Sequence, residues 1–263
     1  MIRAVLLAVL LAAPAAAQES SPDSSPNPAP RPDPEARLDG LAEEEGTPPG
    51  GVLADTDTAG SEEEGREAAP GVWERLAETE ERLSACLARL DELGAGYEQV
   101  AEVTAEDPDC GIANPVTLSS PARGVALSTP ATLRCDAALA VTLWTQRHLQ
   151  PAAEALDRGP LVRLDTGPGY TCRRRNNAAT GVLSEHSFGN AIDVLAFAFA
   201  AGDPIAVEPR EEDGTLAEAF QRTARASSCL YFTTVLGPGT DAAHADHIHA
   251  DIKERRGGYR LCQ

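Results

Sequence analysis

Four of the five histidines in this 263-residue chain lie in two short stretches near its C-terminal end. The first stretch, residues 184–193, reads SEHSFGNAID, and the second, residues 244–251, reads HADHIHAD. Both stretches also contain carboxylates, and imidazole and carboxylate groups are common ligands of divalent metal ions. We therefore expect the fold of this chain to bring the two stretches together.

The residues around the histidines have the pattern of strands. If the sequence HIHADI is a strand, then His247, His249 and Asp251 share one face, and the three apolar residues between them share the other. Residues 191–195 are typical of a buried strand, in which Asp193 is the single charged residue. An unpaired carboxylate in such a place is costly, so Asp193 needs a partner.

A divalent cation is one such partner. Held by His186, Asp193 and one histidine of the His-x-His pair, zinc would keep a fourth position open for water. The alternative is purely structural, because histidines in strands are often hydrogen-bonded residues, and Asp193 can pair with an arginine. We favour the metal interpretation because His186 and Asp193 occur together in one apolar motif that contains a glycine.

These motifs resemble known proteins. The run S-x-H-x-x-G-x-A-x-D from residue 184, followed by a late H-x-H, resembles zinc peptidases such as lysostaphin-type endopeptidases, D-alanyl-D-alanine carboxypeptidases and dipeptidases, and penicillin-insensitive murein endopeptidases. Within that group, about residues 86–262 resemble the bacterial extensin-like C-terminal family. This likeness rests on CGIANP at residue 110, YTCRRR at residue 170, the first stretch and HADHIH at residue 244.

The resemblance implies roles for individual residues. The metal ligands would be His186, Asp193 and His249, with one ion of zinc or another divalent metal as cofactor. Two candidates are open for proton transfer. His247 matches the first histidine of the lysostaphin-type pattern, and Asp246 lies where carboxypeptidase relatives carry a longer glutamate. We favour His247.

Other residues would hold the substrate or support the site. By resemblance, Arg173 or Arg175 would bind substrate, because a guanidinium is a permanent forked donor to a carboxylate or an oxyanion. A solvated loop that pairs with neighbouring acids is an equal alternative for these arginines. Ser184 would brace the loop or the substrate, and His244 would support the site.

The function that the resemblance implies is that of a secreted metallopeptidase or amidase. Its substrate would be the peptides of peptidoglycan, in the periplasm or cell envelope. The competing class is a non-catalytic, metal-containing protein that binds the cell wall. The expected fold is α+β, with a small antiparallel sheet that carries the metal site, flanked by helices as in D-Ala-D-Ala peptidases and hedgehog proteins.

The N-terminal residues have the pattern of a secretory signal. Residues 1–17 combine a basic start at Arg3, an apolar run and an Ala-x-Ala sequence that predicts cleavage after Ala17. The alternative is an uncleaved anchor, although the apolar run is short for a membrane span. We expect no stable membrane anchor after cleavage.

Residues 18–70 differ in composition from the rest of the chain. They are rich in Pro, Ser and Gly and hold fourteen acidic residues against three arginines. Such a segment buries too little apolar surface to offset the entropy of ordering, so we predict a disordered linker. The net charge of −19 also argues against nucleic acid as a partner, because phosphate binding requires a basic surface.

Six cysteines follow the predicted signal. An even number in an oxidising compartment predicts three disulfides, and the absence of a C-x-x-C motif argues against a cysteine zinc site. The sequence leaves the pairing open among Cys86, Cys110, Cys135, Cys172, Cys229 and Cys262.

The folded part is expected to consist of residues 71–105 packing on a main domain at 106–263. Five leucines predict one helix over residues 72–94, with an ion pair from Glu78 to Arg82. In the main domain we predict helices at 131–150, with His148 in the core or at its boundary, and at 216–228. The remaining predicted strands lie at 115–118, 161–165, 195–199, 205–207 and 230–236.

Overall fold

The computed structural model describes residues 71–210 and 212–263. The predicted signal peptide, residues 1–17, and the predicted linker, residues 18–70, lie outside the described residues. None of the helices in the described part of the chain has the length and apolar character needed to cross a membrane.

The largest sheet has seven strands, and β8 (Ala191–Phe199) lies near its centre. The strand order is β12-β10-β11-β8-β7-β5, with β9 also paired to β8. The other strands are β5 (Ala126–Leu127), β7 (Leu161–Thr166), β9 (Ile205–Ala206), β10 (Thr234–Leu236), β11 (Ile248–Asp251) and β12 (Leu261–Cys262). The sheet is antiparallel except at its two edges, where β5 runs parallel to β7 and β12 runs parallel to β10. It is therefore larger than the small antiparallel sheet that we predicted, although the α+β class is confirmed.

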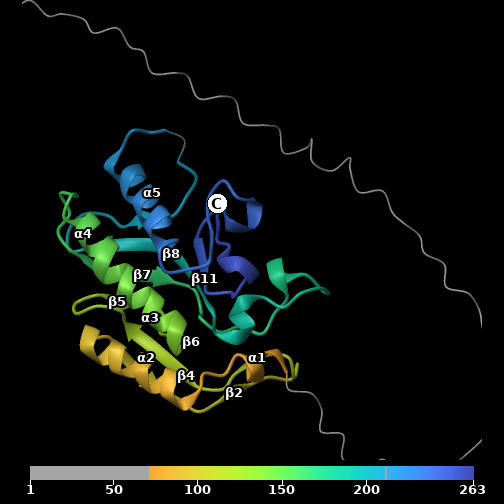
Figure 1. Ribbon diagram of the computed structural model, residues 1–263. Helices are drawn as coiled ribbons and strands as arrows, with labels where there is room; N and C mark the ends of the chain where they lie inside the picture. Colours follow the sequence, from red (N-terminus) through yellow and green to blue (C-terminus); the bar gives the residue numbers. More distant parts are fainter. Residues whose placement is uncertain (1–70, 211) are drawn as a thin grey trace, which may run out of the picture. The chain divides into compact units, whose positions relative to one another are not determined.

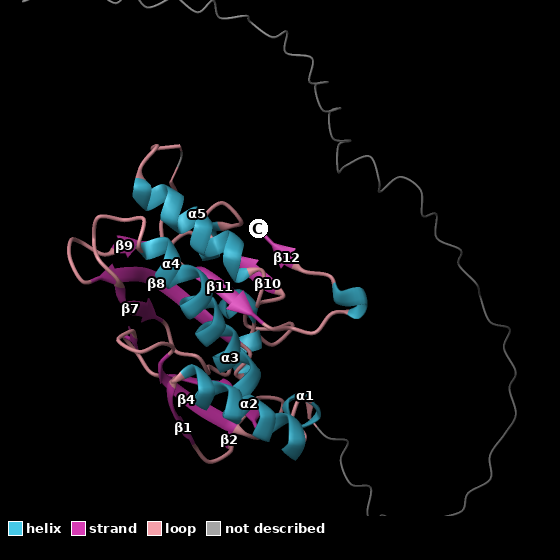
Figure 2. Ribbon diagram, turned by 60° about the vertical axis from the view of Figure 1, so that its left-hand side comes forward, coloured by secondary structure: helices cyan, strands magenta, loops and turns pink. Residues whose placement is uncertain are grey.

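Helices pack along one side of this sheet (Figures 1 and 2). Two of them are α3 (Cys135–Trp144) and α5 (Leu216–Ser228). Trp144 sits at the centre of the core, with its ring edge-on to Phe197 of β8 at 6.4 Å and to Phe232 at 6.1 Å. Ile192 and Val194 are buried in the same core. Because neighbouring strand residues point to opposite faces, Asp193 is directed away from this core.

The predicted helix at 131–150 begins later than expected. Residues Ala131–Arg134 form strand β6, which pairs with β4 (Pro115–Ser120), and β4 pairs in turn with β1 (Gly96–Gln99). α3 is followed by a π-helical turn, η2 (Thr145–Leu149), and then by the short helix α4 (Gln150–Ala153). The strand pairing with β4 outweighs the local helical pattern at 131–134. This pairing is a tertiary contact, and sequence periodicity does not reveal it.

The predicted helix at 72–94 is two helices, α1 (Val72–Arg75) and α2 (Glu80–Leu93). The Thr79 hydroxyl caps α2 by accepting from the Arg82 amide, and Gly94 ends the helix in a left-handed conformation at φ 67°. The predicted Glu78–Arg82 pair is wrong. Glu78 precedes the helix and is buried against Arg134, with Oε1 2.9 Å from Nε.

The remaining predicted elements have mixed outcomes. Strand β10 begins at Thr234, because residues 230–233 form a turn instead of the start of a strand. The helix predicted at 216–228 is α5 with the same bounds. The His148 ring lies 3.0 Å from the Tyr231 hydroxyl, so this histidine is at the core boundary, as predicted.

Three disulfides form among the six cysteines, as predicted. One links α2 to the start of α3, one links the segment before β3 (Gly111–Ile112) to the segment after β7, and one links the end of α5 to β12. The pairs are Cys86–Cys135, Cys110–Cys172 and Cys229–Cys262.

Candidate metal centre

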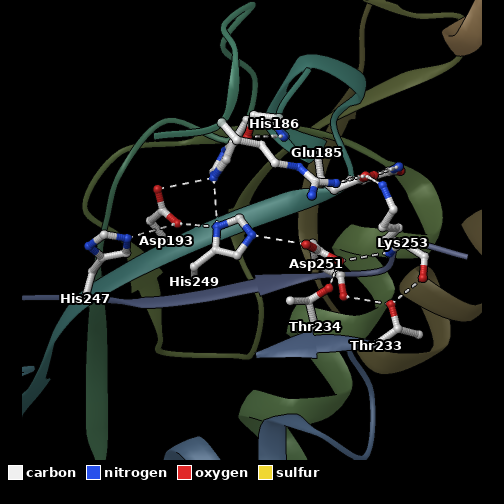
Figure 3. A network of polar contacts seen from close by, with 12 residues as sticks. Glu185, His186, Asp193, Thr233, Thr234, His247, His249, Asp251 and Lys253 are labelled. Atoms are coloured by element: carbon white, nitrogen blue, oxygen red, sulfur yellow. Dashed lines mark hydrogen bonds and ion pairs between the residues drawn. The ribbon is translucent and has the colours of Figure 1, made fainter. Parts of the chain in front are cut away.

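Strand pairing places Asp193 and His249 side by side. β8 and β11 are antiparallel neighbours, and their register sets Asp193 directly opposite His249. His249 Nδ1 lies 2.9 Å from Asp193 Oδ1 (Figure 3). Ile248 and Ala250 are buried in the core. A slip of one residue in this register would expose them and bury the polar residues, so core packing fixes the pair.

His186 reaches this pair from a short 3-10 helix, η4 (Glu185–Phe188). The Ser184 side chain accepts from the His186 amide at the start of this helix, and Gly189 ends it at φ 65°. A Cβ at Gly189 would lie 2.4 Å from a neighbouring side chain, so glycine is required there. The His186 Nε2 atom lies 3.2 Å from Asp193 Oδ2 and 3.3 Å from His249 Nδ1.

The ligand cluster, which we define as His186, Asp193 and His249, has donor atoms that all lie within 4.8 Å of one another. Its outward atoms are already bonded: His186 Nδ1 to the Gly169 carbonyl at 2.8 Å and His249 Nε2 to Asp251 Oδ2 at 3.1 Å. Carbonyl and carboxylate oxygens accept hydrogen bonds, so if a metal ion replaced the inward hydrogen bonds to Asp193, each neutral imidazole would carry its proton outward. Two nitrogen lone pairs and one carboxylate then converge, and these donors fit a divalent cation.

The electrostatics of the cluster also favour positive charge at its centre. Burial raises the pKa of Asp193, but hydrogen bonds and charge from His186 and His249 hold it well below its ordinary value. Burial lowers the pKa of His249, but Asp193 and Asp251 outweigh this effect and raise the pKa to about 9. A group that so strongly favours an extra proton also favours a metal ion in the same place.

The ligand cluster opens into a cavity of about 440 Å³. Five of the predicted site residues line this cavity beside the cluster, and they are Arg173, Arg175, Ser184, His244 and His247. Asp246 does not line it, because its side chain is 85% exposed and projects outward. The structure thus brings together eight of the nine predicted site residues and places Asp246 at the rim.

Two more histidines border the cluster. His247 Nε2 lies 3.7 Å from Asp193 Oδ1, and its Nδ1 lies 2.9 Å from Asp246 Oδ1. This hydrogen bond is the main cause that lowers the pKa of Asp246. The His244 ring lies 5.3 Å from the His247 ring and is held through Nδ1 by Asp241 at 2.7 Å.

The arginine loop, which we define as residues 173–183, forms one wall of the cavity. Its two ends pair by an isolated bridge between Arg174 and Leu183. The Cys110–Cys172 disulfide and an ion pair of 3.0 Å between Arg174 and Asp107 fasten the loop to the preceding part of the chain. Within the described residues, no hydrogen bond or ion pair holds the Arg173 guanidinium.

Sequence reasoning missed three polar groups next to the cluster. The first is Asp251, which bonds to His249, and the second is the Gly169 carbonyl, which bonds to His186. The third is the buried Glu185 carboxylate, which lies 2.6 Å from Lys253 Nζ. Strand alternation already placed Asp251 on the face of His249, so its role was within reach, whereas the other two contacts depend on loops.

Comparison with known proteins identifies the family. The model of the family described as "Extensin-like protein C-terminus" matches residues 84–263, which include the ligand cluster, the arginine loop and all six cysteines. Among curated proteins and solved structures, none matches the chain. The family match covers more than half of the sequence and confirms the likeness to the extensin-like C-terminal family. This chain is therefore a member of the extensin-like protein C-terminus family.

Proposed function

We propose that this protein is a secreted, zinc-dependent peptidase or amidase that acts on the peptides of peptidoglycan. The observation that carries the proposal is the ligand cluster itself, where two imidazole nitrogens and one carboxylate meet at the floor of an open cavity. The sequence likeness to zinc peptidases supports the same assignment, with a fold of the D-Ala-D-Ala peptidase type.

Three protein ligands are the number found in catalytic zinc sites, whereas structural sites use four. His186, Asp193 and His249 would hold the ion and leave one position facing the cavity. A zinc ion bound there would polarise a scissile carbonyl and lower the pKa of a water molecule. His186 and His249 would keep their outward hydrogen bonds to Gly169 and Asp251, which fix the orientation of both rings.

His247 is the best placed group for proton transfer. Its Nε2 faces the cluster, and its Nδ1 is held by Asp246, so the ring is oriented by a carboxylate on its far side. A histidine in this arrangement can take a proton from water and give it to the leaving amine. Asp246 is the alternative, but its exposed side chain lies outside the cavity wall.

The arginine loop supplies the means to hold an anionic peptide. Arg173 and Arg175 line the cavity, and Arg255, near the C-terminal end of the chain, lines it as well. A permanent guanidinium suits the carboxylates that peptide substrates carry. The arginine loop itself holds three arginines and no acidic residue, in a chain with a net charge of −19.

The three disulfides support secretion, because such bonds persist in oxidising compartments such as the bacterial periplasm. The sequence of residues 1–17 supports the same route.

The test combines elemental analysis with digestion of murein sacculi. The purified protein is expected to contain one zinc ion and to release muropeptides, and a chelator should abolish the release. The variant His249→Ala should lose both metal and release. His148→Gln is the matched control, because His148 bonds to Tyr231 away from the cluster and should keep both. A wild-type protein without metal, or release that persists in His249→Ala, would contradict the proposal.

A second experiment assigns the proton-transfer group. His247→Gln should lower the rate of release by about 100-fold or more, since general acid–base catalysis contributes roughly 10²–10⁴-fold. Zinc content should stay at one ion, because His247 is not one of the three ligands. An unchanged rate would remove His247 from the mechanism.

The arginine loop also favours a second candidate function, that of a metal-containing protein that binds the cell wall without cleaving it. Such a protein would adhere tightly to sacculi and leave them intact, with or without chelator. Adhesion that requires Arg173 while no muropeptide is released would favour this candidate over the enzyme.

A further inference from the structure

Asp251 is buried beside the ligand cluster and has a hydrogen-bond partner on each oxygen. It lies on β11 with 4% of its surface exposed. Its Oδ2 faces His249 Nε2 at 3.1 Å, and its Oδ1 lies 2.5 Å from Thr234 Oγ1 and 3.0 Å from the Lys253 amide nitrogen (Figure 3). The carboxylate therefore accepts from three directions.

The direction of each hydrogen bond follows from the outermost member, Arg255. Arg255 has donors only, so its Nη2 donates to Thr234 Oγ1 at 2.7 Å. The Thr234 hydroxyl has a single proton, and it donates that proton to Asp251 Oδ1. The Lys253 amide donates to the same oxygen. Asp251 thus acts as an ionised acceptor, and its second oxygen accepts from His249 Nε2.

We propose that Arg255, Thr234 and Asp251 form a positioning relay that holds His249 with its proton on Nε2 and its Nδ1 lone pair directed at the metal. The inference rests on the proposed function, because the metal is the proposed zinc ion. None of the three residues contacts the ion. They act through His249, and so they are positioning residues rather than ligands.

The relay matters because the other tautomer of His249 would block the site. A proton on Nδ1 would lie between His249 and His186, whose facing nitrogens are 3.3 Å apart. The Gly169 carbonyl orients the His186 ring in a similar way, because it accepts from the nitrogen on the far side of that ring. Unlike this neutral carbonyl, the Asp251 carboxylate also places negative charge behind the His249 ring. A carboxylate in this position makes an imidazole more basic and a better ligand. Arg255 lines the cavity, so the relay runs from the cavity wall to the ligand.

The variant Asp251→Asn tests the relay with a side chain of the same shape. The fixed donors, Thr234 and the Lys253 amide, would select the amide oxygen and turn the NH₂ group toward His249 Nε2. His249 would then accept at Nε2 and carry its proton on Nδ1. The dissociation constant for zinc, measured by competition with a chromophoric chelator, should rise about 10–100-fold, the usual effect of losing such a partner.

Controls separate the relay from general damage. Asp165→Asn makes the same change in an ion pair with Arg163 on β7, away from the cluster, and should leave zinc affinity unchanged. Thr234→Val should weaken zinc binding, and Thr234→Ser, which restores the hydroxyl, should restore it. Zinc affinity of Asp251→Asn within about threefold of wild type would overturn the relay.

A measurement without metal keeps the relay testable if the wild type binds no zinc. In the metal-free protein His249 Nδ1 faces Asp193 Oδ1 at 2.9 Å and Nε2 faces Asp251 Oδ2 at 3.1 Å, so each nitrogen has a carboxylate to which it can donate. Long-range nitrogen–proton NMR spectra should show a proton on Nε2 in the wild type and none on Nε2 in Asp251→Asn, where the amide NH₂ group would donate to that nitrogen. A proton that stays on Nε2 in Asp251→Asn would overturn the relay. Absence of zinc from the wild type would instead overturn the proposed function.

Discussion

The ligand cluster and the arginine loop face the same cavity but are held by different forces. His186, Asp193 and His249 are largely buried, with side chains 1%, 17% and 12% exposed, and two of them are fixed by strand register. In the arginine loop, residues 175–182 are exposed, and the loop is held by the adjacent disulfide and by the ion pairs of Arg174 with Asp107 and of Arg175 with Glu185. The proposed metal ligands are therefore fixed mainly by the sheet, whereas the proposed substrate contacts lie on a loop that a disulfide and ion pairs attach to the rest of the fold.

Removal of the central carboxylate should have the largest effect on this comparison. Asp193→Ala deletes one of the three proposed ligands. Zinc sites bind with about 10–16 kcal/mol shared among their ligands, so the loss should be roughly 3–4 kcal/mol or several hundred-fold in affinity. Competition with a chromophoric chelator measures it, and the arginine loop should be unaffected in limited proteolysis. Zinc binding close to that of the wild type would mean that the cluster is not the metal site.

Removal of the Cys110–Cys172 disulfide should free the arginine loop and leave zinc binding intact. The double variant Cys110→Ser/Cys172→Ser opens a loop with a separation of 62 residues and should cost about 3 kcal/mol in unfolding free energy. Trypsin should cut after the arginines of the freed loop, while zinc affinity stays within about threefold of wild type. The matched control is loss of Cys229–Cys262, which should destabilise the fold without exposing the arginine loop. A large fall in zinc affinity would show that loop and cluster are coupled.

The pH dependence of the unfolding free energy should report on the ligand cluster and not on the arginine loop. In the metal-free protein the pKa of His249 is raised from 6.5 to about 9. A raised pKa stabilises the fold at low pH, so this contribution is complete below about pH 6.5 and disappears as pH rises through about 9. The loss should be about 3 kcal/mol in unfolding free energy. Denaturant titrations from pH 6 to pH 10 measure it, and His249→Gln should remove the dependence. A flat profile in the wild type would exclude this charge state of His249.

The sequence predicted the sheet part of the site because strands follow a simple rule. Alternation placed His249 and Asp251 on one face, and the apolar run around Asp193 identified its strand, so their adjacency was predictable. The same rule also predicts the contact between His249 and Asp251, because residues two positions apart lie on one face of a strand. The position of His186 depends on η4 and Gly189, which a motif likeness supplies and periodicity does not.

Long-range contacts account for what the sequence did not reveal. The pairing of six cysteines is decided by which segments meet in space, and so are the strand at Ala131–Arg134 and the ion pair of Glu78 with Arg134. The helix expected at 72–94 is interrupted because Thr79 caps a new helix, a local signal that a leucine pattern concealed. Local rules therefore described single elements, and tertiary contacts set their limits.

The smallest effect is expected at the outer edge of the cavity, for Asp246→Asn. The Asp246 side chain is 85% exposed and contacts the site only through its hydrogen bond of 2.9 Å to His247 Nδ1. An exposed pair of this kind contributes less than about 1 kcal/mol, so the rate of muropeptide release should fall by less than about fivefold. Measured beside His247→Gln, this variant separates an orienting partner from the proton-transfer group itself. If Asp246→Asn lost as much activity as His247→Gln, proton transfer would belong to Asp246, and the exposed rim would share the chemistry that we assign to the buried side of the cavity.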